Sequence, residues 1–565
     1  MRQLLILLFT LLLFAACEKG SSENKILQIA VKEDSNASIT IDSEKNTVQI
    51  AVNKSLSLNA LTLNFAISPL SKISPTTGIA QDFSNPVQYT VTAENGDKRV
   101  YTISISNLSD EKKIVSATSG STLNPSTGVI NGTNLTISIP FGIDPKNLAV
   151  NATLSVGATA SPAFGIAYDY SAPKTHTITA ANGTKTNYTV TVNVKPQETA
   201  VRAVWLPSSE HTTSFMTYSN VQASISLLDQ LNFNTLYVCA WANGKTCFDS
   251  EILNQNSTWG SARNGNFYAN YTGGSGDALA DIITVAHTKG IKVILWYEYG
   301  FMANWKAKGT GGVTVADNKV FAKHPEWIGL DSNGSQANYN GTDYYFNGYD
   351  PAVQNFMISM MEESLTKYPD LDGIQGDDRM PAAPRNSGYE AVTKALYKNQ
   401  YGVDPPSDFQ NAQWVRWRLD QLNAFGRTMH ARIKAKKPSA IVCFSPNKYP
   451  WCEANLMQDW PQWIKDGIVQ ILSVQCYVKP NYATDVAAAI ATIQATGTTK
   501  NLLNPGMILK NGSTLLTEQE LVNQLKINIQ YNTNGEAQFW FDGLKEPYIQ
   551  NVFKAFYPGK AIFPL

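Results

Sequence analysis

From residue 200 onward the sequence alternates between short apolar segments and longer segments with helical periodicity. Apolar runs separated by helical patterns favour parallel strands that are joined by helices. There are eight apolar segments, the number of strands that closes a (β/α)8 or TIM barrel. We therefore predict an α/β barrel over residues 200–565. The expected strands are Val201–Leu206, Thr235–Trp241, Lys292–Glu298, Leu371–Asp377, Ala440–Ser445, Val469–Tyr477, Leu502–Ile508 and Glu536–Phe541, and helical patterns include Ala278–His287, Ala352–Lys367, Asn411–Lys436, Asp485–Gln494 and Glu518–Ile529.

The region before the barrel contains an internal repeat of short alternating β segments and polar turns. The copies span residues 25–108 and 109–196. Each carries an Asn-Gly pair between two alternating runs, Asn95-Gly96 and Asn182-Gly183, which predicts a tight hairpin. We expect two all-β, Ig-like sandwiches in a multidomain chain, followed by a linker at residues 196–199. The repeated segments are Gly78–Ser84 with Gly165–Ser171, and Tyr89–Gly96 with His176–Gly183. The pair resembles the tandem β-sandwich repeats common in surface lipoproteins of the Bacteroidetes type.

The N-terminus has the features of an export signal. Residues 1–16 combine a charged start with a short apolar run, which predicts a signal peptide that is removed. The run ends at Cys17 and resembles a bacterial lipobox, in which the cysteine is lipidated. Residues 17–24 then read as a polar tether. We expect a membrane-anchored lipoprotein at the outer membrane, the cell surface or the periplasm.

Composition restricts the classes of partner and cofactor. Lys and Arg total 45, as do Asp and Glu, so no basic field attracts nucleic acid. The chain contains no phosphate-cradling glycine loop and only five scattered histidines, so we expect neither a cofactor nor a metal site. Five cysteines follow Cys17, and a disulfide between Cys239 and Cys247 is sterically possible. We expect a monomer.

The expected fourth strand ends in two adjacent acids, Asp377 and Asp378. Catalytic groups of such barrels lie at the C-terminal ends of the strands. Because strand residues alternate between faces, Gln375 and Asp377 should share the inward face. Asp377 is then the expected nucleophile or transition-state stabiliser, and Asp378 orients loops or binds a sugar hydroxyl; the reverse assignment stays open. A solvated turn with a helix cap is the structural alternative.

A second carboxyl group is needed if the chemistry is glycoside hydrolysis. Glu298 ends the third strand between Tyr297 and Tyr299, and burial among aromatic rings raises a carboxyl pKa, as a general acid requires. Asp459 follows the fifth strand and is the other main candidate, with Glu453 in the same loop. Because Asp459 precedes Trp460-Pro461, helix capping is an equally good reading of that residue.

Further polar and aromatic residues lie at strand ends, where they could bind sugar. Neutral amides and hydroxyls read sugar hydroxyls at little charge cost, and aromatic faces stack on pyranose rings. Long connections at residues 243–274, 300–349 and 379–410 would wall a cleft around them. The candidate binding residues are Trp205, Trp241, Trp296, Tyr297, Gln375, Asn447, Gln475, Tyr477, Trp540 and Asp542, and at least two of the tryptophans are expected in the core.

Several ordered motifs resemble the glycosyl hydrolase-like 10 family of bacterial glycosidase-like proteins. They are Arg202–Leu206, Trp296–Gly300, His324–Trp327, Asp372–Asp378, Ser445–Asn447, Gln458–Trp460 and Val474–Tyr477. The resemblance implies hydrolysis of glycosidic bonds in a TIM barrel. The expected substrate is a poly- or oligosaccharide, either an environmental or dietary glycan or a peptidoglycan strand. The alternative is a non-catalytic, cell-surface glycan-binding lipoprotein.

Overall fold

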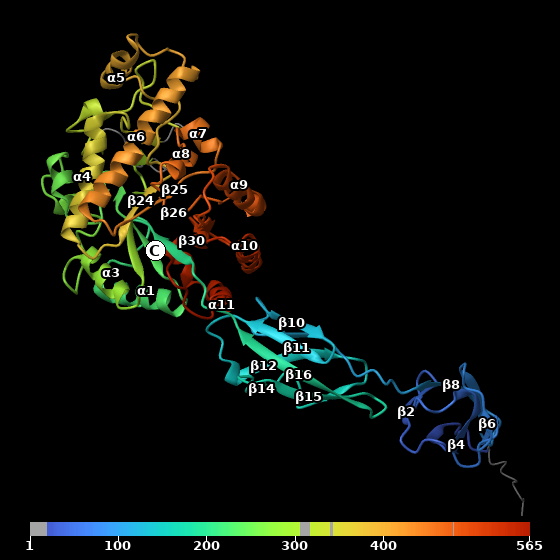
Figure 1. Ribbon diagram of the computed structural model, residues 1–565. Coiled ribbons are helices and arrows are strands. Elements are labelled where there is room, and N and C mark those ends of the chain that lie inside the picture. Colours follow the sequence, from blue (N-terminus) through green and yellow to red (C-terminus); the bar gives the residue numbers. More distant parts are fainter. Residues whose placement is uncertain (1–19, 306–316, 340–342, 478) are drawn as a thin grey trace, which may run out of the picture. The chain divides into compact units, whose positions relative to one another are not determined.

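The computed structural model describes residues 20–305, 317–339, 343–477 and 479–565 (Figure 1). The expected signal peptide and the lipidation site Cys17 lie outside these residues. The chain divides into two compact units, one within residues 1–193 and the other mainly residues 194–565. Among the described helices, none is long and apolar enough to cross a membrane.

The first unit is all-β and contains both copies of the repeat. The first copy has strands β1 (Ile26–Val31), β2 (Ser38–Asp42), β3 (Thr47–Val52), β4 (Leu61–Ile67), β5 (Lys72–Ser74), β6 (Ala80–Gln81), β7 (Val87–Thr92) and β8 (Lys98–Asn107). They form sheets of order β1-β4-β6 and β2-β3-β8-β7-β5. Alternating residues of these strands, such as Val48, Ile50 and Ile103, are buried in the core between them.

The second copy repeats the strand sequence in one eight-stranded sheet, β13-β15-β16-β11-β10-β9-β12-β14. Both predicted hairpins are confirmed: Thr92 pairs with Lys98, and Thr179 pairs with Lys185. Gly96 and Gly183 adopt positive φ angles of 94° and 83°, which glycine tolerates without strain. The strands are β9 (Ile114–Ser119), β10 (Ser126–Asn131), β11 (Asn134–Ile139), β12 (Leu148–Leu154), β13 (Thr159–Ser161), β14 (Ala167–Tyr168), β15 (Lys174–Thr179) and β16 (Lys185–Val194).

The second unit is built on an eight-stranded parallel sheet of order β26-β25-β24-β21-β18-β17-β30-β27. Parallel bridges from Leu472 to Leu503 and from Gln475 to Gly506 join its two edges, so the pairing runs round a ring. Each of the eight predicted strands overlaps one of these. The observed bounds are β17 (Val201–Leu206), β18 (Thr235–Cys239), β21 (Lys292–Trp296), β24 (Gly373–Asp377), β25 (Ile441–Ser445), β26 (Ile471–Leu472), β27 (Gly506–Ile508) and β30 (Gly535–Phe539).

Helices surround this sheet (Figure 1). They begin where the sequence supplies caps: Asp277 Oδ1 accepts from the backbone N–H of Ala280, and Thr517 forms a capping box with Glu520. Five of them match the predicted helical patterns closely. The helices are α1 (Tyr218–Gln230), α2 (Glu251–Gln255), α3 (Ala278–His287), α4 (Pro351–Lys367), α5 (Ala391–Tyr401), α6 (Ala412–Lys436), α7 (Trp451–Leu456), α8 (Trp460–Lys465), α9 (Tyr482–Ala495), α10 (Glu518–Tyr531) and α11 (Pro547–Phe556).

Two expectations change at this level. Strand β26 is shorter than predicted and spans only Ile471–Leu472, although Gln475 N beyond it still donates to Pro446 O. Cys239 and Cys247 are buried free thiols, so the disulfide that their spacing allowed is not formed. Short antiparallel pairs lie in the connections: β19 (Trp241–Ala242) with β20 (Lys245–Thr246), β22 (Met302–Trp305) with β23 (Asp343–Tyr345), and β28 (Lys510–Asn511) with β29 (Thr514–Leu515).

Candidate active site

Strand β24 ends in Asp377, whose carboxylate is held by the neighbouring strand ends. Asp377 Oδ1 accepts hydrogen bonds from Ser445 Oγ at 2.9 Å and from Gln475 Nε2 at 3.0 Å. Ser445 is the last residue of β25, and Gln475 follows β26. Asp377 is fully buried. The carboxylate thus points into the ring of strands, as strand alternation predicted.

Gly376 allows the chain to fold back directly after this strand. A Cβ atom at residue 376 would lie 2.6 Å from the backbone oxygen of Met380 and 2.8 Å from the Phe444 ring. The turn is closed by a hydrogen bond of 3.1 Å from Met380 N to Asp377 O. Any larger residue would therefore displace the turn that carries the two aspartates.

One guanidinium group binds both aspartates. Arg379 Nη1 lies 3.1 Å from Asp377 Oδ2 and 2.9 Å from Asp378 Oδ1. Burial raises the pKa of Asp377, the neighbouring Asp378 raises it further, and Arg379 opposes both effects. The Asp378 side chain is 12% exposed and that of Asp377 only 1%. Asp378 is therefore the more accessible carboxylate of the pair.

Glu298 follows β21 and belongs to the same electrostatic cluster. Arg379 Nη1 donates to its backbone oxygen at 3.2 Å. Within the described part of the chain, the buried Glu298 Oε2 has no hydrogen-bond partner. Burial raises the pKa of Glu298, Arg379 lowers it, and Asp378 raises it. The result is a half-buried carboxyl group that stays protonated to higher pH than an ordinary glutamate, the property that a general acid requires.

Some of the predicted sugar-binding residues are buried, and others are partly exposed. Gln375 lies beneath Asp377, and its Oε1 accepts from Trp205 Nε1 at 2.8 Å. Trp205, Trp241, Trp296 and Tyr297 are buried, so the stacking role predicted for them has no exposed face in this structure. Trp241, for example, donates its indole N–H to Gly300 O and packs against Phe346 and Phe356. Tyr477 and Trp540 remain half-buried, and both rings contact Phe539.

Gln458 is a residue whose role sequence reasoning missed. Its side chain is fully buried, and Nε2 donates to the backbone oxygen of Asp377 at 3.0 Å. Its Oε1 accepts from the backbone N–H of the predicted binding residue Asn447 at 3.3 Å. One amide thus joins the turn after β24 to the loop after β25. The Gln458–Trp460 motif indicates this segment, but its acid, Asp459, is the residue that sequence reasoning selects.

Asp459 and Asp542, by contrast, are bound outside this cluster. Asp459 Oδ2 accepts from Asn423 Nδ2 at 3.2 Å and lies 3.4 Å from Arg416 Nη2, both on α6. Asp542 Oδ1 accepts from Thr212, Ser214 and Lys545. Burial alone would raise the pKa of Asp542, but these partners hold it below its usual range.

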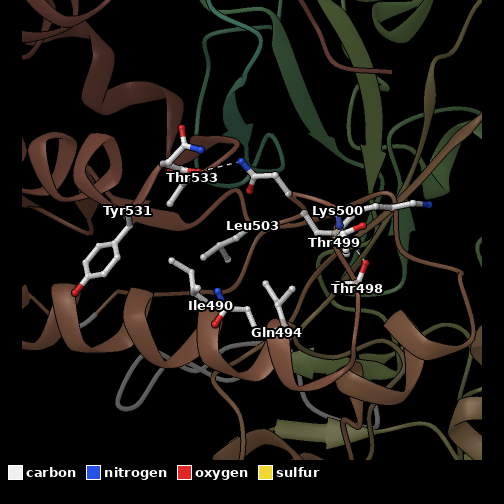
Figure 2. Close-up of a pocket in the computed structure, with 12 residues that line it drawn as sticks. Ile490, Gln494, Thr498, Thr499, Lys500, Leu503, Tyr531 and Thr533 are labelled. Carbon is white, nitrogen blue, oxygen red and sulfur yellow. Dashed lines mark hydrogen bonds between the residues drawn. The ribbon is translucent and has the colours of Figure 1, made fainter.

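The described residues contain no group of three or more His, Cys, Asp or Glu side chains arranged to hold a metal ion. Hollows do occur elsewhere on this unit. One of about 310 Å³ lies between the C-terminal ends of α9 and α10, and Figure 2 shows its lining. The loop from α9 into β27 contributes Thr498, Thr499 and Lys500, and Tyr531 contributes an exposed ring. Because these segments precede strands, this hollow lies at the opposite end of the sheet from Asp377.

Known proteins of similar structure include several glycoside hydrolases. The glycoside hydrolase domain of PgaB (BpsB) from Bordetella bronchiseptica is 12% identical; the match covers 60% of this chain and 93% of that one, with a TM-score of 0.42. The catalytic domain of β-amylase from Paenibacillus polymyxa is 13% identical, over 64% of this chain and 99% of that one, with a TM-score of 0.43. Among curated proteins no relative matches.

Family models match both units of the chain. The model described as SGBP, N-terminal matches residues 26–105 and again residues 117–192, one match for each copy of the repeat. The model described as glycosyl hydrolase-like 10 matches residues 200–510, which is more than half of the 565 residues. The motifs that carry the site, from Arg202–Leu206 to Val474–Tyr477, all lie within this match. The chain belongs to the glycosyl hydrolase-like 10 family.

Proposed function

We propose that this protein is a glycoside hydrolase that cleaves a poly- or oligosaccharide with carboxyl groups at the C-terminal ends of β21 and β24. The observation that carries the proposal is the cluster of Glu298, Asp377 and Asp378 around one arginine, Arg379. Glycoside hydrolysis needs one carboxyl group that is protonated and another that is ionised. The raised pKa of Glu298 suits the protonated group, and Asp378, 2.9 Å from the Arg379 guanidinium, is placed to serve as the second carboxylate.

In this mechanism Glu298 donates its proton to the oxygen of the leaving sugar. Asp378 faces the anomeric carbon, either as the nucleophile or as the base that activates water. Asp377 acts as a positioning residue, because it is enclosed by Ser445, Gln475 and Arg379 and shares that arginine with Asp378. This is the assignment of the two aspartates that the sequence left as its second choice.

The remaining parts fit an exported, glycan-degrading protein. The ring of eight parallel strands supports a (β/α)8 barrel, and the two repeat copies would be Ig-like spacers between the barrel and a lipid on Cys17. Tyr477 and Trp540 supply partly exposed rings for a sugar, with Gln475 and Asn447 as polar neighbours. The buried Trp205, Trp241, Trp296 and Tyr297 would support this surface from below, and Asp459 and Asp542 would stabilise the loops around it.

One observation favours a second function. The N-terminal region matches a family described as SGBP, N-terminal, which is consistent with a surface glycan-binding protein. In that case the same acids and rings would hold glycan without cleaving it.

The test is product release from a panel of soluble glycans and peptide-free peptidoglycan strands. The chain would carry Cys17→Ser, which prevents lipidation, and the control would be the same chain with Asp377→Asn and Asp378→Asn. We expect reducing sugar from the first protein and none from the second. Binding to a glycan in affinity electrophoresis without any release would instead establish the binding function.

A further inference from the structure

Two exposed aromatic rings meet on the surface after strand β25. Trp451, the first residue of α7, is 38% exposed, and Tyr339 is 40% exposed. Their ring centroids lie 5.4 Å apart, with planes inclined by 87°. The two residues come from the connections after β25 and β21, more than 100 positions apart in the sequence. The fold thus brings together two large apolar faces that most proteins would bury.

A small hollow lies beside Trp451, with an apolar floor of Val474, Ala488 and Ala489. It has a volume of about 200 Å³, and its lining includes Trp451, Tyr449, Lys448 and Asp485. Lys448 Nζ lies 3.0 Å from Asp485 Oδ2, and the lysine side chain is 31% exposed. Aromatic faces with a few fixed polar groups beside them form the usual composition of a small-ligand site. A pyranose ring matches this composition, because its C–H faces are apolar and its edge carries hydroxyl groups.

The loop that carries these groups is hydrogen-bonded, through Gln458, to the turn that bears Asp377. Asn447 N donates to Gln458 Oε1, and Gln458 Nε2 donates to Asp377 O. Trp460 Nε1 also donates to Asn447 O at 3.2 Å. These hydrogen bonds restrain the loop, and restraint of a loop before binding reduces the ordering cost of binding.

The hollow lies at the same end of the sheet as the carboxylate cluster. Lys448, Tyr449 and Trp451 follow the C-terminal end of β25, and Asp485 is in the first turn of α9, which follows β26. Trp451 lies six positions after Ser445, which binds Asp377, so the two lie within about 22 Å by chain length alone. A glycan chain only a few sugar units long can bridge that distance.

We propose that Trp451, Tyr339 and the Lys448–Asp485 hollow form a distal sugar-binding subsite for a polysaccharide. This inference rests on the proposed function. The chain would lie across the barrel end, with one sugar on the Trp451 face while another is held at Glu298 and Asp378. The substrate class would then be a polymer, and short oligosaccharides would use only part of the site.

The test compares Trp451→Ala and Tyr339→Ala with wild type on full-length and short forms of whichever panel glycan is cleaved fastest. Tyr531→Ala is the matched control, because Tyr531 is also a helix-end ring, 37% exposed, in the hollow at the opposite end of the sheet. We expect Trp451→Ala to raise KM for the full-length chain about tenfold, equivalent to about 1.4 kcal/mol, with kcat retained. On the short form the rise in KM should be less than about twofold. Tyr531→Ala should leave KM unchanged on both forms.

An equal rise in KM on the long and short forms would overturn the subsite. So would an unchanged KM in both Trp451→Ala and Tyr339→Ala. If wild type releases no product at all, the hydrolase proposal fails, and affinity electrophoresis in gels containing the same polysaccharides decides on the subsite. Retardation that weakens in Trp451→Ala and Tyr339→Ala, but not in Tyr531→Ala, would support it. Wild type that migrates freely in every gel would reject it.

Discussion

The two ends of the eight-stranded sheet use similar charged groups for different purposes. At the N-terminal ends, Arg202 on β17 is in register with Glu536 on β30. Arg202 binds Glu198 at 2.6 Å and Gly559 O at 2.7 Å, and it stacks on Tyr557. Here the guanidinium is spread over a carboxylate, a backbone oxygen and a ring, and it ties the ends of the unit together.

At the C-terminal ends, Arg379 instead binds two carboxylates, and Glu298 lies beside them. Its Nη1 serves both Asp377 and Asp378, and Glu298 remains electrostatically coupled to them. Excess buried acid is costly to stability unless it has partners. Changes at the N-terminal end should therefore alter stability and leave activity intact, whereas changes at the C-terminal end should reduce activity and leave stability nearly intact.

The sharpest test of this contrast is Asp378→Asn, which removes one charge and little volume. We expect kcat/KM to fall by at least about 10³-fold, because the proposed group facing the anomeric carbon is lost. Urea unfolding should be nearly unchanged, since this side chain is the more exposed of the pair. Asp377→Asn is the matched control: if it costs more activity than Asp378→Asn without altering stability, the two roles are reversed.

Glu298→Gln should reduce kcat/KM by about 10²- to 10⁴-fold, the usual loss for a general acid. The pKa of Glu298 is raised, so wild type should lose activity as the pH rises and this group ionises. Glutamine does not titrate, and the alkaline limb of the pH–rate profile should therefore disappear in the variant. A variant that keeps the wild-type alkaline limb would assign the acid to another residue.

Arg202→Met tests the opposite end, because methionine keeps the aliphatic stem and removes the guanidinium. We expect a loss of about 2 kcal/mol in the free energy of unfolding, from the broken contacts to Gly559 and Tyr557. The exposed partner Glu198 adds little to this figure. Below the unfolding transition, kcat should match wild type; a large fall in kcat would break the proposed separation between the two ends.

Glu536→Gln should change stability with the opposite sign, and only at high pH. Burial, reinforced by Glu198, raises the pKa of Glu536 from an ordinary 4.5 to about 7, although Arg202 and Asn528 oppose it. A raised pKa means that the stabilising contribution is complete below pH 4.5 and is lost as the pH rises through about 7. The variant should therefore be more stable than wild type at pH 8, by at most about 3 kcal/mol, and show no such gain at pH 4. Unfolding curves at the two pH values measure the difference, and a gain that is equal at both would contradict the assignment.

Much of the fold could be predicted from local pattern. Apolar strand segments separated by helical periodicity gave eight strands in their correct places, and β17 has the predicted bounds. The Asn-Gly pairs located both hairpins of the repeat. These features depend on neighbours in the chain, so the sequence carries them directly.

The candidate site was only partly predictable, because side-chain exposure depends on residues far apart in the sequence. The ends of strands correctly indicated Asp377, Asp378 and Glu298 as neighbours, yet they could not show that Asp377 is enclosed by Ser445 and Gln475. Nor could they show that Trp241 is buried against Phe346 and Phe356.

By itself the sequence determined the positions of the strands along the chain, the repeat, and the acids at the C-terminal end of β24. These features follow from periodicity and turn chemistry. Only the tertiary structure decided which aspartate is accessible, that Gln458 joins two loops, and that Trp451 meets Tyr339. Each of these depends on contacts between connections that leave different strands of the ring. Burial and hydrogen bonding at such a place are set by packing, which no local pattern encodes.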